Sequence, residues 1–537
     1  MVTTIFQKMK NRFYTMFVLL LLMVTQIAKA QSVVEVSGTY YGNVTWEADT
    51  VKIVGDILIE KDDNPSRFVV KPGTYVESLG YYRLTVHNCS FFAEGTDDAP
   101  IVFTARDLTH FDDQSYESGW QGMFVVSEPN MGDSLVMEHC TISYAKVTDG
   151  TPEEDRNGAG LYLNTKKYCR MSHCTVSYNR TYNTGTTQMP GNGGGGVYMM
   201  DPGVCVVEHC LFMHNYGCWG GGMILSGNRT FNVHDCEFVK NRSSYGSAFY
   251  MHIGTSALGP NVYNNFIHAN HGNAVYLSWD VKTGRFHDNV IVNNEGEAPL
   301  LGGTSPNQSL WYNNTIVLNR SSGFMGIQCG GVWTVGEQII FNNIIYANGQ
   351  SFSFGEMQFD YDPVNGSPTL FNNCMSYYHN YPGTIYDEPE FVNPSFGLGP
   401  EYDKPDADWS LRDNSPCINA GSTEQSGYPA TDFYGNPRVS GDAIDIGAVE
   451  NQQFDGMDDF DEDGILVYPN PGNEKLTLVA MENAEISVFD AVGRQVYLEN
   501  DTQVITEIDA GSWSAGVYFI RIVDPSGHVS TKKWIKQ

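Results

Sequence analysis

A four-residue motif recurs along this chain at intervals that correspond to one coil of a solenoid. Early in the chain the motif ends in cysteine, as in Val86-His-Asn-Cys89, and later it ends in asparagine, as in Ile340-Phe-Asn-Asn343. Its last residue lies at Cys89, Cys140, Cys174, Cys210, Cys236, Asn265, Asn289, Asn314, Asn343 and Asn373. The successive steps between these positions are 51, 34, 36, 26, 29, 24, 25, 29 and 30 residues, and the first fits two coils with one motif missed. Periods of about 20 to 50 residues are typical of solenoids.

The sequence between these motifs predicts strands rather than helices. An apolar residue follows most motifs, and an asparagine comes three residues later, in the series Asn179, Asn215, Asn241, Asn270, Asn294, Asn319 and Asn348. Alternating apolar positions, turn asparagines and glycines are typical of short strands. We therefore expect an all-β fold in which each repeat is one coil of a parallel β-helix. About eleven coils stacked roughly 4.8 Å apart would form a rod of roughly 50 Å.

The motif cysteines and asparagines are expected to be structural. In a stack of coils, asparagine amides hydrogen-bond to one another and to turn backbone, and thiols pack as small buried groups. Each His-Cys pair recurs on successive coils instead of converging with others at one point, which argues against a metal site built from these pairs. The 11 cysteines are an odd number, and Cys169 and Cys205, each five residues before a motif cysteine, could pair with each other. That pairing is left open.

The first 30 residues predict a signal peptide. Lys8, Lys10 and Arg12 precede an apolar run over 16–24, and Ala28-Lys-Ala30 offers small residues for cleavage after Ala30. A short N-terminal hydrophobic anchor is the alternative. No other stretch approaches the roughly 20 apolar residues that a transmembrane span requires, so no span is expected.

The chain is strongly acidic, with 62 Asp and Glu against 31 Lys and Arg, a formal net charge of -31. The predicted signal peptide contains four basic residues (Lys8, Lys10, Arg12 and Lys29) and no acids, so its removal would change the charge from -31 to -35. Such a surface repels nucleic acid and anionic lipid, and neither is expected as a partner. Solubility of an exported protein is the favoured explanation of the acidity.

Two segments resemble known bacterial β-helix proteins. The segments 95–104 and 119–123 resemble the opening of right-handed parallel β-helices. The segment Trp409-Ser-Leu-Arg-Asp-Asn-Ser-Pro-Cys-Ile-Asn-Ala-Gly421, with Asp445-Ile-Gly-Ala-Val-Glu450, resembles the terminal region of the choice-of-anchor Q family. The resemblance implies a β-helix over 31–408 closed by a polar terminal cap over 409–450, and it transfers no catalytic residue to this chain. We expect 31–450 to unfold as one cooperative unit.

An acidic linker is predicted over 451–464. Within it Asp459, Asp461 and Asp463 precede Gly464, as at the start of a calcium-binding loop. The position that should carry the last acidic ligand holds Asn470, so the match is partial. Calcium is therefore the one cofactor that the sequence suggests, and a plain solvated linker is the alternative.

The segment 465–537 alternates as strands and predicts a small antiparallel sandwich. It carries Tyr468-Pro-Asn-Pro471, Gly516-Val-Tyr-Phe-Ile-Arg-Ile522 and the basic end Lys532-Lys-Trp-Ile-Lys-Gln537. These motifs resemble, in order, the type IX secretion sorting domain of Bacteroidota. The resemblance implies the secretion machinery as a partner, export through the outer membrane, and a cell-surface or extracellular location. A permanent adhesive domain is the alternative.

Three hypotheses remain for the function of the β-helix. In the strand that follows each glycine-rich turn, the alternation places Tyr162, Tyr198, Tyr250 and Tyr276 outward, with His252 beside them. If exposed, these side chains form an aromatic platform for a polysaccharide or another surface ligand; if a loop covers them, they only stiffen the sheet of a structural spacer. The third hypothesis is a polysaccharide lyase or glycoside hydrolase of the pectate-lyase-like type. No acid, base or carboxylate pair stands out, so the catalytic residues are unknown and enzymatic activity is undecided.

Overall fold

The computed structural model divides the chain into two compact units, each described here by itself. The first contains the described residues up to Asn436 together with Asp445–Glu450, and the second contains Pro437–Ile444 and the described residues from Asn451 onward. The structure describes residues 31–537 except 114–115, 130, 149–156, 165, 183–192, 228–229, 254–258, 278–283, 297–299, 302–308, 322–328, 351–358, 363–365, 379, 405, 424–428, 453–464, 469–471, 480–482, 501, 504, 526, 528 and 537. The predicted signal peptide and the predicted calcium ligands Asp459, Asp461 and Asp463 lie outside the described residues.

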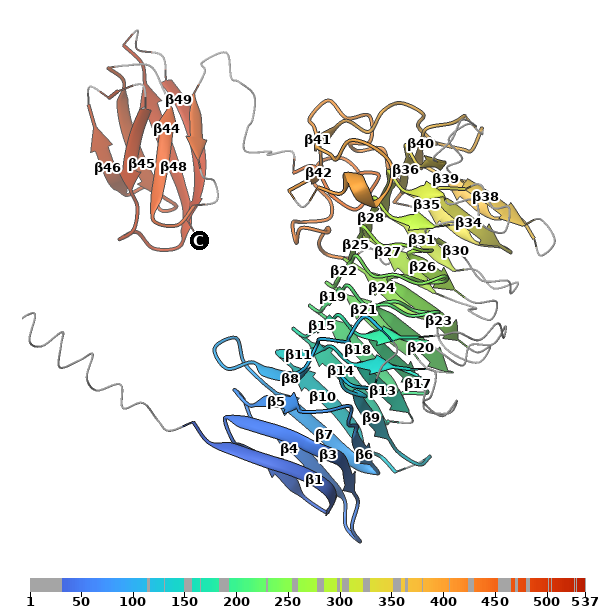
Figure 1. Ribbon diagram of the computed structural model, residues 1–537. Helices are drawn as coiled ribbons and strands as arrows, with labels where there is room; N and C mark the ends of the chain where they lie inside the picture. The colour runs from blue at the N-terminus through green and yellow to red at the C-terminus, as the bar shows by residue number, and fades with distance from the viewer. Residues whose placement is uncertain are drawn as a thin grey trace, which may run out of the picture. The chain divides into compact units, whose positions relative to one another are not determined.

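The first unit is a parallel β-helix whose coils run through three rows of strands, sheets A, B and C (Figure 1). Sheet A contains β1 (Val33–Tyr41), β3 (Thr50–Glu60), β6 (Leu84–His87), β9 (Met123–Val126), β13 (Leu161–Asn164), β17 (Val197–Met200), β20 (Met223–Gly227), β23 (Phe249–Ile253), β26 (Val275–Leu277), β30 (Leu300–Leu301), β34 (Val332–Val335) and β38 (Phe359–Asp362). Sheet B contains β2 (Val44–Trp46), β4 (Ser66–Val70), β7 (Cys89–Glu94), β10 (Ser134–Glu138), β14 (Tyr168–Ser172), β18 (Val204–Glu208), β21 (Thr230–His234), β24 (Asn261–Tyr263), β27 (Arg285–His287), β31 (Leu310–Tyr312), β35 (Ile339–Phe341) and β39 (Thr369–Phe371).

Sheet C joins sheet A at the N-terminal end, because the long strand β3 pairs with both β5 and β6. It contains β5 (Tyr75–Ser78), β8 (Ile101–Ala105), β11 (Cys140–Ser143), β15 (Thr175–Ser177), β19 (Leu211–Met213), β22 (Glu237–Val239), β25 (Phe266–His268), β28 (Val290–Val292), β32 (Thr315–Val317), β36 (Ile344–Tyr346) and β40 (Cys374–Met375). Short bridges beside it are β12 (Lys146–Val147) with β16 (Arg180–Thr181), and β29 (Glu295–Gly296) with β33 (Arg320–Ser321) and β37 (Gly349–Gln350).

One continuous apolar core fills the coils. It extends from Val36 at the first strand to Met375 in β40. The parallel pairing keeps equivalent positions in line, so that Met223 lies opposite Phe249 and Leu225 opposite Met251, and all four side chains are fully buried. Each coil therefore covers the apolar side chains of its neighbours, which is the arrangement that the repeat predicts.

The turn from sheet B to sheet C has the same backbone conformation on successive coils. The residue before the motif's last position has a φ between 46° and 55°, at His139, His173, His209, Asp235, Asn264, Asp288, Asn313, Asn342 and Asn372. Asn88 has the same conformation, with a φ of 52°, but lies in the turn from β6 of sheet A to β7 of sheet B. Asparagine and aspartate tolerate this left-handed region better than most residues. The turn points the next side chain into the coil, where the Asn and Cys ladders form.

The asparagine ladder is hydrogen-bonded from coil to coil. The Nδ2 atom of Asn265 donates to Oδ1 of Asn289 at 2.9 Å, and Asn289 donates in the same way to Asn314 at 2.9 Å. The series continues through Asn343 to Asn373 at 2.9 and 3.1 Å. Each amide also donates to a backbone carbonyl in the sheet B strand of the preceding coil. The second asparagine series, from Asn179 to Asn348, is bonded in the same pattern.

After β40 the chain returns along the outer face of sheet C. The returning segment contains β41 (Phe391–Asn393), the short 3-10 helix η4 (Pro400–Tyr402) and β42 (Asp408–Leu411), and β41 pairs antiparallel with β42. Trp409, Leu411, Cys417, Ile446 and Ala448 pack against a row of valines and isoleucines on the outside of sheet C, Val290, Val292, Val317 and Ile344. We call the residues 388–412 the strap.

The second unit consists of two antiparallel sheets with their own core. One sheet contains β43 (Leu466–Tyr468), β44 (Lys475–Val479) and β47 (Ile505–Asp509), and the other contains β45 (Glu485–Asp490), β46 (Gln495–Glu499), β48 (Gly516–Val523) and β49 (Val529–Lys536). Leu476, Ile486, Ile520 and Trp534 are fully buried in its core. Among the described residues, no helix has the length and apolar character needed to cross a bilayer.

Candidate functional site

The outward-facing tyrosines form a row but not an exposed surface. Tyr162 lies opposite Tyr198, and Tyr250 lies opposite Tyr276, in adjacent strands of sheet A. The four side chains keep only 8, 5, 5 and 9% of their surface exposed, in that order. They form a separate cluster on the outside of the core, together with Phe124. Of the two alternatives, the exposed platform is therefore wrong, and covered, packed rings describe the geometry.

Two aromatic residues in the preceding turns provide part of the cover. Trp219 stacks on Tyr245 at a centroid distance of 4.5 Å, and its edge contacts Tyr250 at 5.1 Å. Tyr245 contacts Tyr276 at 5.2 Å. His252 remains exposed at the end of β23. The signal for this cover was present in the sequence, because Trp219 and Tyr245 precede equivalent glycine turns on successive coils.

The motif cysteines are buried thiols. Those from Cys140 onward lie inside the turn from sheet B to sheet C, whereas Cys89 begins β7 in sheet B opposite Ser66, and the residue opposite Cys140 is Ile101. Cys89, Cys140, Cys174, Cys210 and Cys236 are at most 2% exposed, and all are free. The backbone N–H of Cys174 donates to Sγ of Cys210, and that of Cys236 donates to Oδ1 of Asn265. Burial raises the pKa of the Cys210 thiol well above its ordinary value, so this thiol stays neutral.

Cys169 and Cys205, whose pairing the sequence leaves open, lie directly opposite each other in β14 and β18. Both are free thiols in the structure. Each Sγ contacts Sδ of Met199, at 3.8 Å from Cys169 and 3.3 Å from Cys205. The two residues therefore belong to a buried sulfur cluster beneath sheet A.

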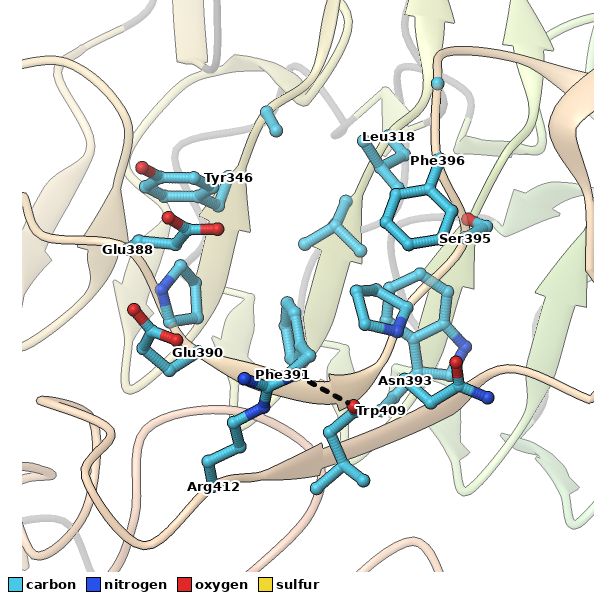
Figure 2. Close-up of a pocket in the computed structure, with 16 residues that line it drawn as sticks. Leu318, Tyr346, Glu388, Glu390, Phe391, Asn393, Ser395, Phe396, Trp409 and Arg412 are labelled. Atoms are coloured by element: carbon cyan, nitrogen blue, oxygen red, sulfur yellow. Dashed lines mark hydrogen bonds between the residues drawn. The ribbon is translucent and has the colours of Figure 1, made fainter.

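An open cavity of about 480 Å³ lies between the strap and the outer face of sheet C (Figure 2). Val317, Leu318, Tyr346 and Ala347 line it from the side of the coils. The strap contributes Glu388 to Gly397, Trp409 and Arg412. We call this cavity the strap pocket.

The strap is fixed to the coils by polar contacts beyond the pocket. Asn293, in a left-handed turn of sheet C, donates from Nδ2 to the carbonyl of Gly397 at 2.9 Å and to that of Gly399 at 3.2 Å. The N–H of Gly399 donates to the carbonyl of Leu318 at 3.0 Å. These bonds hold the strap against two successive coils, so the pocket has a rigid wall.

Two ion pairs lie next to these bonds. Arg320 pairs with Glu401 of the strap and, at 3.1 Å, with Glu295 of the neighbouring coil. The hydrogen bond from Arg320 lowers the pKa of the Glu401 carboxyl. The Glu401 carboxylate therefore stays charged, and the ion pair adds to the attachment of the strap.

His268 attaches the strap to the coils through Asp403. Its Nδ1 lies 2.9 Å from Oδ1 of Asp403, and its Nε2 lies 3.0 Å from Oε1 of Glu237. Burial alone would lower the pKa of His268, but the hydrogen bonds to Asp403 and Glu237 outweigh it and raise the pKa. An imidazole hydrogen-bonded to two carboxylates therefore joins the strap to β22 and β25.

The strap pocket combines aromatic rings with carboxylates. In the view of Figure 2, Tyr346 and Glu388 lie at one end, Phe396 lies at the other, and Phe391 lies between them. The Phe396 ring is 78% exposed. Aromatic faces of this kind bind apolar surfaces of a ligand, and carboxylates accept hydrogen bonds from its hydroxyl groups.

Further polar groups at the wall are held in fixed positions. Asn393 accepts a hydrogen bond from Lys404 Nζ at 2.6 Å, and Arg412 donates from Nη2 to the carbonyl of Val392 at 3.2 Å. Glu390 has a φ of 56°, a left-handed conformation that costs a glutamate roughly 1 kcal/mol or more. The indole N–H of Trp409 is buried with no acceptor among the described residues. An unpaired buried donor and a strained backbone are features that functional sites retain.

Trp409 and Arg412 belong to the segment that resembles a terminal cap, but no residue of the strap pocket was predicted from the sequence to be functional. Its glutamates are a few among 62 acidic residues, and its walls come from segments that are far apart in sequence. The contact between Asn293 and Gly397, for example, spans 104 residues. A local sequence pattern cannot predict a contact between segments so far apart.

Two family models match the chain. Residues 116–320 match the model of a right handed beta helix region, and residues 466–537 match that of a secretion system C-terminal sorting domain. The chain carries a right-handed β-helix and a C-terminal sorting domain. The sorting domain indicates export by the type IX system to the cell surface or the extracellular space, as the sequence analysis expects. No match was found among curated proteins.

Solved structures similar to this β-helix protein have low sequence identity to it. Pectate lyase Pel9A is 14% identical, with a TM-score of 0.33, over 71% of this chain and 88% of that protein. The periplasmic alginate epimerase AlgG is 11% identical, with a TM-score of 0.27, over 64% of this chain and 85% of that protein. PorZ, a surface component of the type-IX secretion system of Porphyromonas gingivalis, is 21% identical with a TM-score of 0.14. That match covers 16% of this chain and only 12% of PorZ.

Proposed function

We propose that this exported β-helix protein binds an extracellular saccharide in the strap pocket. The observation that carries the proposal is the composition of the pocket wall, where Tyr346, Phe391 and Phe396 lie beside Glu388 and Glu390 in one open cavity. A sugar ring presents apolar C–H faces and a rim of hydroxyl groups. Aromatic faces and carboxylate acceptors together match both parts of such a ligand.

The charge of the protein favours an uncharged saccharide over a polyanion. The chain has a formal net charge of -31. The pocket itself contains two glutamates and one cationic side chain, Arg412. An approaching polyuronate would be repelled by this field, whereas a neutral or amino sugar would not be.

The proposal is tested by titrating the mature secreted protein with a panel of neutral, amino-sugar and uronic-acid oligosaccharides in a calorimeter. Phe396→Ala is the informative variant, because a ring that is 78% exposed contributes little to folding. We expect it to lower the affinity for the bound saccharide by about tenfold or more, the effect of removing one well-placed aromatic contact. Tyr378→Ala removes a comparably exposed ring, 72%, outside the pocket and should leave the affinity unchanged.

Two results would contradict the proposal. One is the absence of binding to every saccharide in the panel, and the other is an equal loss of affinity in both variants. Incubation of the same panel, read by reducing ends and by absorbance of unsaturated sugars, separates binding from catalysis. Product formation that disappears in Glu388→Gln or Glu390→Gln would show that the pocket is an active site.

A further inference from the structure

A second group of side chains, on the outer side of the turn between sheets B and C, gathers donors of a different chemical type. Glu138 ends β10, and His139 and His173 follow β10 and β14 on neighbouring coils. One donor atom from each of these residues lies within 4.8 Å of those of the other two. The group is at least 144 residues away in sequence from every residue of the strap pocket, counted from His173 to Val317, and shares no side chain with it.

The backbone fixes the positions of the two histidines. Both occupy the left-handed turn position, with φ values of 46° at His139 and 53° at His173. Their rings stack with centroids 4.7 Å apart and planes 19° apart. The cysteine that follows each histidine points into the core, whereas the imidazoles stay at the surface. The His-Cys pairs are therefore divided between two sides of the turn, and it is the histidines of successive coils that come together.

The hydrogen bonds of the rings leave one nitrogen of each available. Nδ1 of His139 lies 3.1 Å from a carboxylate oxygen of Asp97, and Nδ1 of His173 lies 2.8 Å from the hydroxyl of Ser172. Within the described part of the chain, Nε2 of either ring has no partner. A carboxylate on Nδ1 holds that nitrogen protonated and leaves the lone pair on Nε2, which is the tautomer that binds metals.

We infer that Glu138, His139 and His173 bind one divalent transition-metal ion of the zinc or nickel type. Two imidazoles and one carboxylate suit these ions, whereas calcium and magnesium prefer oxygen donors alone. Three protein donors leave a fourth tetrahedral position for water or for a donor from another molecule. A bound ion would also link two neighbouring coils on a face where the described chain has no disulfide.

The donors must approach one another when the ion binds. Metal–nitrogen bonds of about 2.0 to 2.1 Å place tetrahedral ligands roughly 3.4 Å apart, which is less than the limit of 4.8 Å that the three donors satisfy. His173 is exposed and Glu138 is half-exposed, so rotation of these side chains closes the gap. Arg170 competes for Glu138, with Nη1 3.8 Å from Oε1, but its shorter contact of 2.6 Å is to Glu208.

The test uses the mature full chain after removal of metals with a chelator, titrated in a calorimeter with zinc chloride, nickel chloride or calcium chloride. We expect about one zinc or nickel ion per chain to bind through this group. His139→Gln and His173→Gln should each lower the affinity for zinc by about tenfold or more, as loss of a ligand does at other sites. Calcium should show no difference between these variants and the parent protein.

His214→Gln is the matched control. His214 has the same kind of left-handed turn position, with a φ of 54°, but its ring stacks on Tyr178 at 4.8 Å, which offers no second imidazole. Zinc affinity should therefore be unchanged in this variant, and circular dichroism checks that each variant is folded. Equal zinc affinity in the parent and in His173→Gln would overturn the inference, as would an equal loss in His214→Gln.

Discussion

The amide of Asn314 should be among the most costly side chains to remove from the β-helix. Its Nδ2 donates to the carbonyls of Phe286 and Tyr312 at 2.9 and 3.1 Å and to Oδ1 of Asn343 at 2.9 Å. Its Oδ1 accepts from the backbone N–H and from Nδ2 of Asn289 at 3.1 and 2.9 Å. Two N–H groups serve three acceptors, so these contacts amount to about four full hydrogen bonds. At about 1 kcal/mol each, Asn314→Ala should destabilise the protein by roughly 4 kcal/mol.

The assay is urea unfolding of the mature chain, followed by tryptophan fluorescence and by circular dichroism to test whether the transition is cooperative. Cys210→Ala is the comparison, because Cys210 has the equivalent ladder position but only weak sulfur contacts, at 3.2 Å to the carbonyl of Glu208 and 3.4 Å from the N–H of Cys174. Removing its buried thiol should cost about 1 to 2 kcal/mol. If the two variants differ by less than about 1 kcal/mol, the amide ladder does not stabilise the fold in the way described.

Three further predictions concern the strap, the covered tyrosines and the sorting domain. The folded-state pKa of His268 is raised, so protonated His268 stabilises the fold fully below its unfolded pKa of about 6.5, and this stabilisation is lost as the pH rises through its folded pKa. Amide hydrogen exchange around Asp403 should therefore accelerate with pH more than the intrinsic exchange rate does. In His268→Gln this additional acceleration should vanish. Tyr250→Ala should lower the free energy of unfolding by roughly 3 kcal/mol, because the ring is 5% exposed, and a loss below about 1 kcal/mol would mean that the ring is not packed. Deletion of 465–537 should leave a folded β-helix that no longer reaches the cell surface, because each unit has its own core; surface labelling of the truncated protein would detect the opposite outcome.

The architecture could be predicted from the sequence because the same chemical requirement returns on each coil. The ladder position must accept a hydrogen bond inside a tight turn, and Cys210 and Asn314 both satisfy it. The row of tyrosines follows in the same way from alternation along the strands. The burial of the tyrosine row could not be predicted from this alternation. The side chains of Trp219 and Tyr245 that cover it come from turns, and the strand pattern does not determine the path of a turn.

The two candidate sites were beyond prediction for different reasons. The strap pocket depends on the return of the chain across sheet C, and the bonds from Asn293 to Gly397 and Gly399 that fix it join segments with no shared pattern. The Glu138 group lies within the repeat itself. There the recurrence of each His-Cys pair suggested isolated pairs, and only the stacking of coils shows that His139 and His173 are direct neighbours.

The amide ladders give the β-helix an electrical direction. Within each ladder the amide oxygen faces the preceding coil and accepts from its amide, while Nδ2 donates to the amide oxygen of the following coil, from Asn265 to Asn373 in one series and from Asn179 to Asn348 in the other. Side-chain dipoles aligned in this way add and strengthen one another. The N-terminal end of each series therefore carries a partial negative charge, and the C-terminal end carries a partial positive charge. A coil therefore cannot be reversed without loss, because the amide oxygen that begins the series at Asn265 accepts from the backbone N–H of Cys236 in the coil before it.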